Sequence, residues 1–224
     1  MSVTKLSKPV LFMLYGLPGA GKSVFGHELS KLLKIAYVSS DEIRSMLFDQ
    51  PNYAKEQEAV VTSVMDFMTT NFLRSGVSVV YGANAARFAE RKRLRELALA
   101  QKAEPLLVWF QVDAETAFSK AKTRLENKKH KLPAIPLDET MFRSLASGMQ
   151  NPYLNEEYTV VSGKHLFAMQ KKAILRKLHD ARLLSDESLQ PKIPMPGMVN
   201  LVSQATNQHT PGRVDLARRN INIK

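Results

Sequence analysis

Residues 16–23, which read GLPGAGKS, restrict the fold of this chain more than any other segment. Gly16 and Gly21 are spaced so that Lys22 and Ser23 follow directly. Such a loop turns tightly enough for several backbone N–H groups to face one concavity, because residues without a Cβ occupy its sharpest bends. Lys22 can then reach the terminal phosphates of a bound nucleotide, and the Ser23 hydroxyl can ligate Mg²⁺. The predicted ATP-binding segment comprises Gly16, Leu17, Pro18, Gly19, Ala20, Gly21, Lys22, Ser23 and Val24.

The segments on either side of the loop favour this interpretation. Residues 9–15 (PVLFMLY) form a short apolar run that is typical of a buried parallel strand, and residues 24–33 (VFGHELSKLL) have helical spacing. Strand, loop and helix in this order place the partial positive charge of a helix N-terminus at the phosphate site.

Strands and helices continue to alternate along the chain. Short apolar runs predict further strands at residues 35–39, 77–81, 106–112 and 158–161. Longer helical patterns occupy residues 52–75, 87–102, 113–131, 138–150 and 164–184. This alternation predicts an α/β fold in which helices cover both faces of a five-stranded parallel sheet. Ligands bind at the carboxyl ends of the strands in such sheets, so the polar segments that follow the strands are expected to meet at one cleft.

The helical segments also have predicted faces. The helix at residues 52–75 is expected to bury one apolar stripe, made of Ala59, Val60, Val64, Phe67, Met68 and Phe72. The helix at residues 87–102 is expected to bury Leu94, Leu97 and Ala98. Its basic side chains are interpreted mainly as a solvated outer face: Arg87, Arg91, Lys92, Arg93 and Arg95. Ser40 is the expected N-cap of a short helix after the second strand.

The domain is expected to span residues 1–184. Two segments differ from the regular alternation of strands and helices, one inside this domain and one after it. Residues 113–150 contain two helical patterns separated by a proline break at residues 132–136, and they are expected to form a helical lid over the phosphate site. Residues 185–224 are punctuated by proline and glycine without sustained periodicity. They are expected to be a tail that is either docked on the domain or disordered.

The composition limits the classes of function. The formal net charge is +11, which favours polyanionic partners, nucleic acid among them. The chain has no cysteine, which excludes disulfides, thiolate metal sites and cysteine nucleophiles. No apolar run approaches the roughly 20 residues that a membrane span needs, and the N-terminus lacks the apolar region of a secretory signal. A cytoplasmic protein without a membrane partner is therefore expected.

Asp41 and Arg44 are the second candidate site. An acid after the second strand faces the phosphate loop across the cleft, where its carboxylate can accept a proton from an attacking hydroxyl during phosphoryl transfer. Arg44 can orient Asp41 or hold an acceptor phosphate. The alternative is a purely local role, in which Asp41 supports the helix start and Arg44 is its i,i+3 partner.

Four segments together resemble a known family. They are GLPGAGKS, SSDEIR after the second strand, YGAN after the third, and RLENKKHKLPAIPLDETMFRSL in the expected cover. Over residues 9–184 they are similar to P-loop kinases of the polynucleotide-kinase type, whose wider relatives include small-molecule phosphotransferases such as those that act on chloramphenicol. The resemblance implies a P-loop NTPase three-layer sandwich with a helical lid, and ATP and Mg²⁺ as cofactors.

The resemblance also implies roles for individual residues. Lys22 matches the phosphate-binding lysine, and Ser23 matches the hydroxyl that ligates magnesium. Asp41 matches the general base for an acceptor 5′-hydroxyl, and Arg44 matches the arginine that contacts the acceptor's phosphate. Arg124 and Lys128 match a pair of basic residues that clamp the transferring phosphate.

Gly82 departs from the family pattern, which has an aspartate at the end of the third strand. Three hypotheses therefore stand open. The first is an ATP-dependent kinase whose preferred acceptor is a polynucleotide 5′-hydroxyl. The second is a phosphotransferase for a small molecule such as a nucleoside, sugar or antibiotic. The third is a nucleotide-binding protein whose catalysis is degraded by the missing carboxylate.

Overall fold

The computed structural model describes residues 6–52, 54–126, 137–153 and 155–184, which all lie in one compact unit, Met1–Gln190. The strands are β1 (Val10–Gly16), β2 (Ala36–Ser39), β3 (Val79–Asn84), β4 (Glu104–Gln111) and β5 (Tyr158–Ser162). The helices are α1 (Lys22–Leu33), α2 (Ser40–Leu47), α3 (Lys55–Arg74), α4 (Phe88–Ala100), α5 (Ala114–Glu126), α6 (Glu139–Ser147) and α7 (Phe167–Asp180). Each strand and helix expected from the sequence has a counterpart. The expected break at 132–136 and the expected tail at 185–224 fall outside the described residues.

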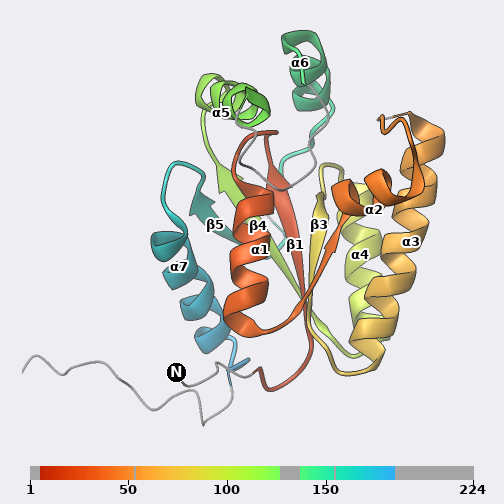
Figure 1. Cartoon of the computed structure of the whole chain (residues 1–224). Helices are drawn as coiled ribbons and strands as arrows, with labels where there is room; N and C mark the ends of the chain where they lie inside the picture. Colours follow the sequence, from red (N-terminus) through yellow and green to blue (C-terminus); the bar gives the residue numbers. More distant parts are fainter. Residues whose placement is uncertain (1–5, 53, 127–136, 154, 185–224) are drawn as a thin grey trace, which may run out of the picture. The chain divides into compact units, whose positions relative to one another are not determined.

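The strands form one sheet in the order β2-β3-β1-β4-β5, and every neighbouring pair is parallel (Figure 1). β1 lies at the centre, so both of its edges are paired and both of its faces are covered. All seven residues of β1 are buried for this reason, which accounts for the continuous apolar run in the sequence. The predicted three-layer α/β fold with a five-stranded parallel sheet is confirmed.

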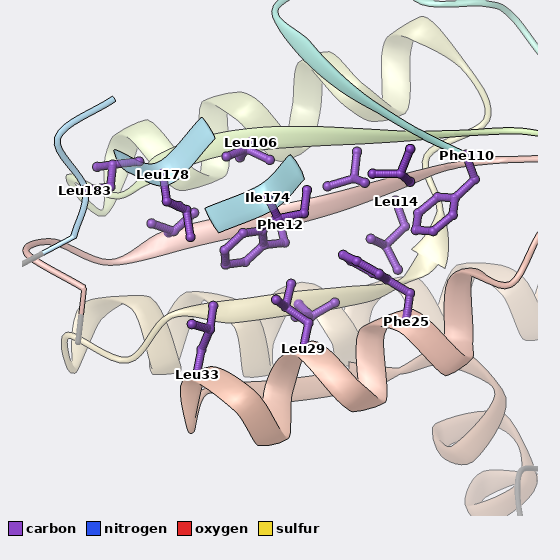
Figure 2. Close-up of a cluster of buried hydrophobic side chains, with 14 of the residues drawn as sticks. Phe12, Leu14, Phe25, Leu29, Leu33, Leu106, Phe110, Ile174, Leu178 and Leu183 are labelled. Carbon is purple, nitrogen blue, oxygen red and sulfur yellow. The ribbon is translucent and has the colours of Figure 1, made fainter. Parts of the chain in front are cut away.

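One face of the sheet packs against α1 and α7. Phe12 and Leu14 of β1 meet Phe25, Leu29 and Leu33 of α1, and Ile174 and Leu178 of α7 complete the cluster (Figure 2). The Phe25 and Phe110 rings contact each other edge to face, with their centroids 5.1 Å apart. This packing fixes α1, the helix that carries the candidate phosphate loop at its N-terminus.

The opposite face packs against α3 and α4, and here one sequence prediction is only partly right, because of the expected stripe only Met68 and Phe72 are among the side chains packed against the core. The buried side chains of α3 are Val61, Met65, Thr69 and Leu73. Of the expected stripe, Val60 is 47% exposed and Phe67 is 71% exposed. The real stripe is rotated by one residue, about 100° around the helix axis. Apolar residues stand in adjacent pairs along α3, so two overlapping stripes fit the sequence and only the sheet selects between them.

The prediction that Arg91 of α4 lies on a solvated outer face is also wrong. Its side chain is completely buried and forms a two-point ion pair with Glu156, at 2.8 Å from Nε to Oε2 and 2.9 Å from Nη2 to Oε1. Its Nη1 donates to the carbonyl of Gln150 at 2.9 Å, and its guanidinium lies 5.3 Å from the centroid of the Tyr15 ring. Arg91 therefore joins α4 to the segment between α6 and β5. Leu94 and Ala98 are buried as expected.

Two helices lie beyond the carboxyl ends of the strands. These are α5 and α6, at the top of Figure 1. The rings of Phe118 and Phe142 join them, with centroids 5.2 Å apart. The helices thus stand at the edge of the sheet where the candidate site is expected. Among the described residues, no helix combines the length and the apolar composition needed to cross a membrane.

Candidate active site

The loop between β1 and α1 has the features of an anion site. Gly21 caps α1 in a left-handed conformation without a side-chain capping bond, and the first turn of α1 has no acidic residue. The positive end of the helix dipole therefore faces the loop without a competing carboxylate from its own turn. The Lys22 ammonium lies over the loop and donates to the carbonyls of Gly16 and Leu17, at 2.7 and 2.9 Å.

Gly19 brings the loop into direct contact with α5. Its φ is +81°, and a Cβ at this position would lie 2.0 Å from the carbonyl oxygen of Ala117, which is itself fully buried. No side chain other than hydrogen fits this approach. The helix that begins the expected lid is therefore packed on the phosphate loop.

Asn84, the last residue of β3, holds the start of the loop. Its Oδ1 accepts a hydrogen bond from the backbone N–H of Gly16 at 3.2 Å, and its Nδ2 lies 4.0 Å from Sδ of Met149. No role for Asn84 was apparent from the sequence alone, because a single asparagine after a strand has no distinctive spacing. The YGAN segment is the one signal that pointed to it.

The start of α2 places Asp41 at the same edge of the sheet. Ser39, not Ser40, is the N-cap, and its hydroxyl accepts from the backbone N–H of Glu42 at 3.2 Å. The helix begins one residue earlier than expected, which frees the Ser40 hydroxyl to donate to the carbonyl of Gly82 at 3.1 Å. Asp41 is half-buried in the first turn, where the helix dipole stabilises its negative charge.

The ring of Tyr37 in β2 lies between α1 and β3, where a Cβ at Gly26 or at Gly82 would be 2.7 or 2.9 Å from its Cε2. Burial raises the pKa of its phenol to about 12, a hydrogen bond with Ser23 opposes that rise, and the charge of Asp41 adds to it. Sequence reasoning missed Tyr37, because a tyrosine in a strand is most often a core residue.

Arg44 lies deeper than the sequence indicates. Its side chain is 2% exposed, its Nη2 pairs with Oε2 of Glu58 at 2.5 Å, and its Nη1 donates to the carbonyl of Asn52 at 3.4 Å. Arg44 thereby links α2 to α3, and its contact with an acceptor stays a prediction. Arg124 is in the last turn of α5, but its side chain is not part of the description, and Lys128 lies outside the described residues.

The oxygen donors at the loop fit a magnesium ion. Within the described part of the chain, no three His, Asp or Glu side chains gather in a way that could hold a metal by themselves. The Ser23 hydroxyl and the Asp41 carboxylate are hard oxygen ligands, and Mg²⁺ commonly takes one or two protein oxygens together with those of nucleotide phosphates. Asp113 is engaged elsewhere: it accepts from the Thr116 N–H at 2.8 Å and pairs with Lys164 at 2.6 Å. The hydrogen bonds from Lys164 and Thr116 hold the pKa of Asp113 well below its usual range.

An open hollow lies next to the loop, at the carboxyl ends of β4 and β5. A Cβ at Gly163, the residue after β5, would lie 2.9 Å from the Ala20 carbonyl of the loop. Nζ of Lys120 in α5 donates to the Gly163 carbonyl at 2.8 Å. The segment that follows β5 therefore contacts both the loop and α5. The hollow is lined by Gln111, Val112, Asp113, Val160, Ser162 and Lys164.

Comparisons with known proteins agree with this geometry. The sequence profile of a family described as AAA domain matches residues 11–143, which run from β1 into α6. No curated protein sequence shows significant similarity to the chain.

Several solved structures share the fold. Chaetomium thermophilum Kti12 in complex with ADP-AlF3 has a TM-score of 0.59 and 16% identity, over 76% of this chain and 98% of its own. A gluconokinase from Sinorhizobium meliloti 1021 has a TM-score of 0.56 and 13% identity, over 80% of this chain and 97% of its own. The APS kinase CysC of Mycobacterium tuberculosis, in complex with AMPPNP and APS, has a TM-score of 0.55 and 17% identity, over 77% and 98% of the two chains. The chain belongs to the AAA domain family, and its fold is that of the P-loop kinases.

Proposed function

We propose that this protein is an ATP-dependent kinase that transfers the γ-phosphoryl group to a hydroxyl acceptor. The observation that carries the proposal is that the phosphate loop and the first turn of α2, which contains Asp41, are both held at the carboxyl end of β3. Asn84 accepts from the Gly16 N–H at 3.2 Å, and Ser40 donates to the Gly82 carbonyl at 3.1 Å. A loop that holds the triphosphate and a carboxylate that receives a proton are the two parts that such a transfer needs.

Each residue of the site has its own role in the proposed reaction. Backbone N–H groups of the loop and the Lys22 ammonium hold the phosphates, and the Ser23 hydroxyl supplies an oxygen toward magnesium. Mg²⁺, when bound, neutralises charge on the phosphate oxygens. The acceptor oxygen forms a bond to the γ-phosphorus, the bond from that phosphorus to the bridging oxygen of ADP breaks, and Asp41 takes the proton of the acceptor hydroxyl. Catalysis in this arrangement is positioning and charge neutralisation, with Arg124 and Lys128 as the expected clamp on the transferring group.

The open hollow at the ends of β4 and β5 is where we expect the base and ribose of ATP. Gly163, which follows the lining residue Ser162, has its Cβ position 2.9 Å from the Ala20 carbonyl of the loop, so we expect a nucleotide whose phosphates lie on the loop to extend toward the hollow. Its lining combines polar side chains with Val112 and Val160, which suits a base that has an apolar face and polar edges.

A polynucleotide 5′-hydroxyl is the acceptor we favour. The net charge of +11 supports attraction of a polyanion, and Arg44, three residues after Asp41 in α2, is the expected contact for an acceptor phosphate. In the described geometry Arg44 is paired with Glu58, so this contact requires Glu58 to share the guanidinium with the acceptor.

A small-molecule acceptor is the second candidate. Two of the proteins with this fold are named for small acceptors, a gluconokinase and an APS kinase. The burial of Arg44 against Glu58 also favours an enclosed acceptor site over an open basic channel.

The test is transfer of labelled phosphate from ATP to a 5′-hydroxyl oligonucleotide. We expect Asp41→Asn to lower kcat by about 100-fold or more, since general base catalysis typically contributes 10²- to 10⁴-fold, with nucleotide affinity retained. Glu42→Gln is the matched control, because it removes a carboxylate from the same helical turn. Equal rates for the wild type and Asp41→Asn would remove Asp41 from its assigned role.

The same assay separates the three hypotheses. Transfer to a sugar or nucleoside without transfer to the oligonucleotide would select the small-molecule kinase. Tight binding of ATP with no transfer to any acceptor would select a nucleotide-binding protein with degraded catalysis.

A further inference from the structure

The last part of β3 departs from regular pairing with β1. Met13 of β1 stands opposite Tyr81 of β3. The next residue, Leu14, stands opposite Asn84, so residues 82–83 form a bulge in β3. Bulges are common beside functional sites, where they re-aim a side chain. This one brings Asn84 to the place where β1 ends and the phosphate loop begins.

The side chain of Asn84 extends the pairing of the two strands by one hydrogen bond. After β3, the Ala85 N–H donates to the Leu14 carbonyl at 2.9 Å, and the Gly16 N–H then donates to Oδ1 of Asn84 at 3.2 Å. Because an N–H can only donate, this bond fixes the amide with its oxygen toward the loop. On the side of β4, a Cβ at Gly16 would lie 2.8 Å from the carbonyl oxygen of Phe110. The first residue of the loop is thus held closely between β3 and β4.

Met149, which follows α6, lies against the other end of the Asn84 amide. Its Sδ is 4.0 Å from Nδ2 of Asn84. A thioether sulfur is only a weak acceptor. Met149 therefore holds the amide mainly by packing against it, and the oxygen stays directed at Gly16.

The two residues after Met149 are fixed by hydrogen bonds of their own. The Gln150 carbonyl accepts from Nη1 of the buried Arg91 at 2.9 Å. Oδ1 of Asn151 accepts from the hydroxyl of Tyr15 at 2.7 Å. These bonds join the segment after α6 to α4 and to the end of β1, so the position of Met149 is set by the body of the fold.

We propose that Asn84 is a positioning residue for the phosphate loop: its amide oxygen fixes the Gly16 N–H, and Met149 keeps the amide in the orientation that this bond requires. The inference rests on the proposed function, because its effect is seen only when nucleotide phosphates bind at the loop. Asn84 acts through the backbone of the loop and does not touch the nucleotide. A loop whose start is held in advance loses less conformational freedom on binding, so removal of the amide weakens nucleotide binding.

The experiment measures the affinity of the full chain for AMPPNP in the presence of Mg²⁺, by calorimetry. Asn84→Leu removes the amide at nearly equal volume. We expect the Kd to rise by about 10-fold, as when an N–H loses its hydrogen-bond partner.

Ser78→Ala is the matched control, because it removes the same kind of bond at the opposite end of β1. There the Val10 N–H donates to Oγ of the buried Ser78 at 3.0 Å. We expect this variant to have a lower melting temperature and an unchanged affinity for AMPPNP. If Asn84 had a merely structural role, Asn84→Leu would behave in the same way.

Met149→Ala tests how the amide is held. We expect it to raise the Kd for AMPPNP by about 3-fold in the wild-type background and to have no further effect in the Asn84→Leu background, because its effect passes through the amide.

The outcomes are separable. An Asn84→Leu variant that binds AMPPNP as tightly as the wild type overturns the inference alone, and so do additive effects of the two substitutions. If Asn84→Leu does not fold, an unchanged affinity of Met149→Ala overturns it. Absence of AMPPNP binding by the wild type overturns the proposed function, and this inference with it.

Discussion

Gly19 is the residue at which two constraints meet. Its φ of +81° is a conformation that side chains of L-residues rarely adopt, and the Ala117 carbonyl occupies the space a Cβ would need. The turn of the loop requires the positive φ, and the contact between the loop and α5 leaves no space for a Cβ. A substitution here therefore reports on both the phosphate site and the element that covers it.

We expect Gly19→Ala to be more destabilising than its backbone conformation alone requires. The left-handed conformation costs about 1–2 kcal/mol for a residue with a Cβ. Displacement of α5 adds about 1–3 kcal/mol, as overpacking typically does. Gly76→Ala is the control, because Gly76 has a φ of +80° but nothing within 4 Å of its Cβ position. Denaturant unfolding measures both; equal losses of stability would contradict a tight contact between the loop and α5.

At the scale of elements, the sequence predicts the order of strands and helices well because β1, β2 and β3 each show a short apolar run that ends at a glycine or at polar residues. The sequence does not predict which face of a helix is buried. The apolar pairs of α3 fit two faces, and the basic residues of α4 look uniformly solvated although Arg91 is completely buried. Both outcomes depend on partners distant in the sequence: the sheet beneath α3, and Glu156 for Arg91.

The residues of the candidate site also differ in whether the sequence alone can reveal them. The loop at residues 16–23 and the first turn of α2 are local motifs, so their residues can be found from spacing. Tyr37 and Asn84 make their contacts across strands, Tyr37 with Gly82 of β3 and Asn84 with Gly16 of β1, so only the pairing of β2 and β1 with β3 reveals them.

The ion pair between Arg91 and Glu156 makes a prediction about pH. Burial opposes ionisation of Glu156, but the hydrogen bonds from Arg91 and from the Tyr153 N–H outweigh it and keep the pKa of this carboxyl below its ordinary value. A lowered pKa in the folded state stabilises the fold above the unfolded pKa, about 4.3 for glutamate. That contribution is lost as the pH falls through the folded pKa.

Glu156→Gln is accordingly expected to lower the free energy of unfolding at pH 7 by about 3 kcal/mol, because it leaves the buried Arg91 guanidinium without its counter-charge. The difference from the wild type should shrink as the pH is lowered from about 5, since Glu156 of the unfolded chain then begins to take up a proton, and it should vanish once the pH falls below the folded pKa. Denaturant titrations at pH 7 and pH 4 measure this, with the exposed neighbour substitution Glu157→Gln as control. A difference that does not depend on pH would show that the charge of Glu156 contributes nothing.

For the whole molecule, the distribution of charge along the chain decides where a polyanion is attracted. The net charge is +11, and residues 185–224 hold five Lys or Arg against three Asp or Glu. Most of the positive charge therefore belongs to residues 1–184. The N–H of Ser7 donates to the Leu183 carbonyl at 2.9 Å, and Leu6 bridges to Leu184, so the two ends of this part of the chain are joined to each other.

A chain that ends at Leu184 is consequently expected to retain both its stability and its affinity for a 5′-hydroxyl oligonucleotide. If four or more phosphates are contacted, the logarithm of the association constant should fall with the logarithm of the salt concentration with a slope of about −3 or steeper, because single strands release about 0.7 counterions per phosphate. Fluorescence anisotropy between 50 and 300 mM salt measures this slope for the full and the shortened chains. Matching slopes would assign the interaction to residues 1–184. A shortened chain that folds but loses most of the slope would place the polyanion contact in residues 185–224 and remove the support that net charge lends to a polynucleotide acceptor at Asp41.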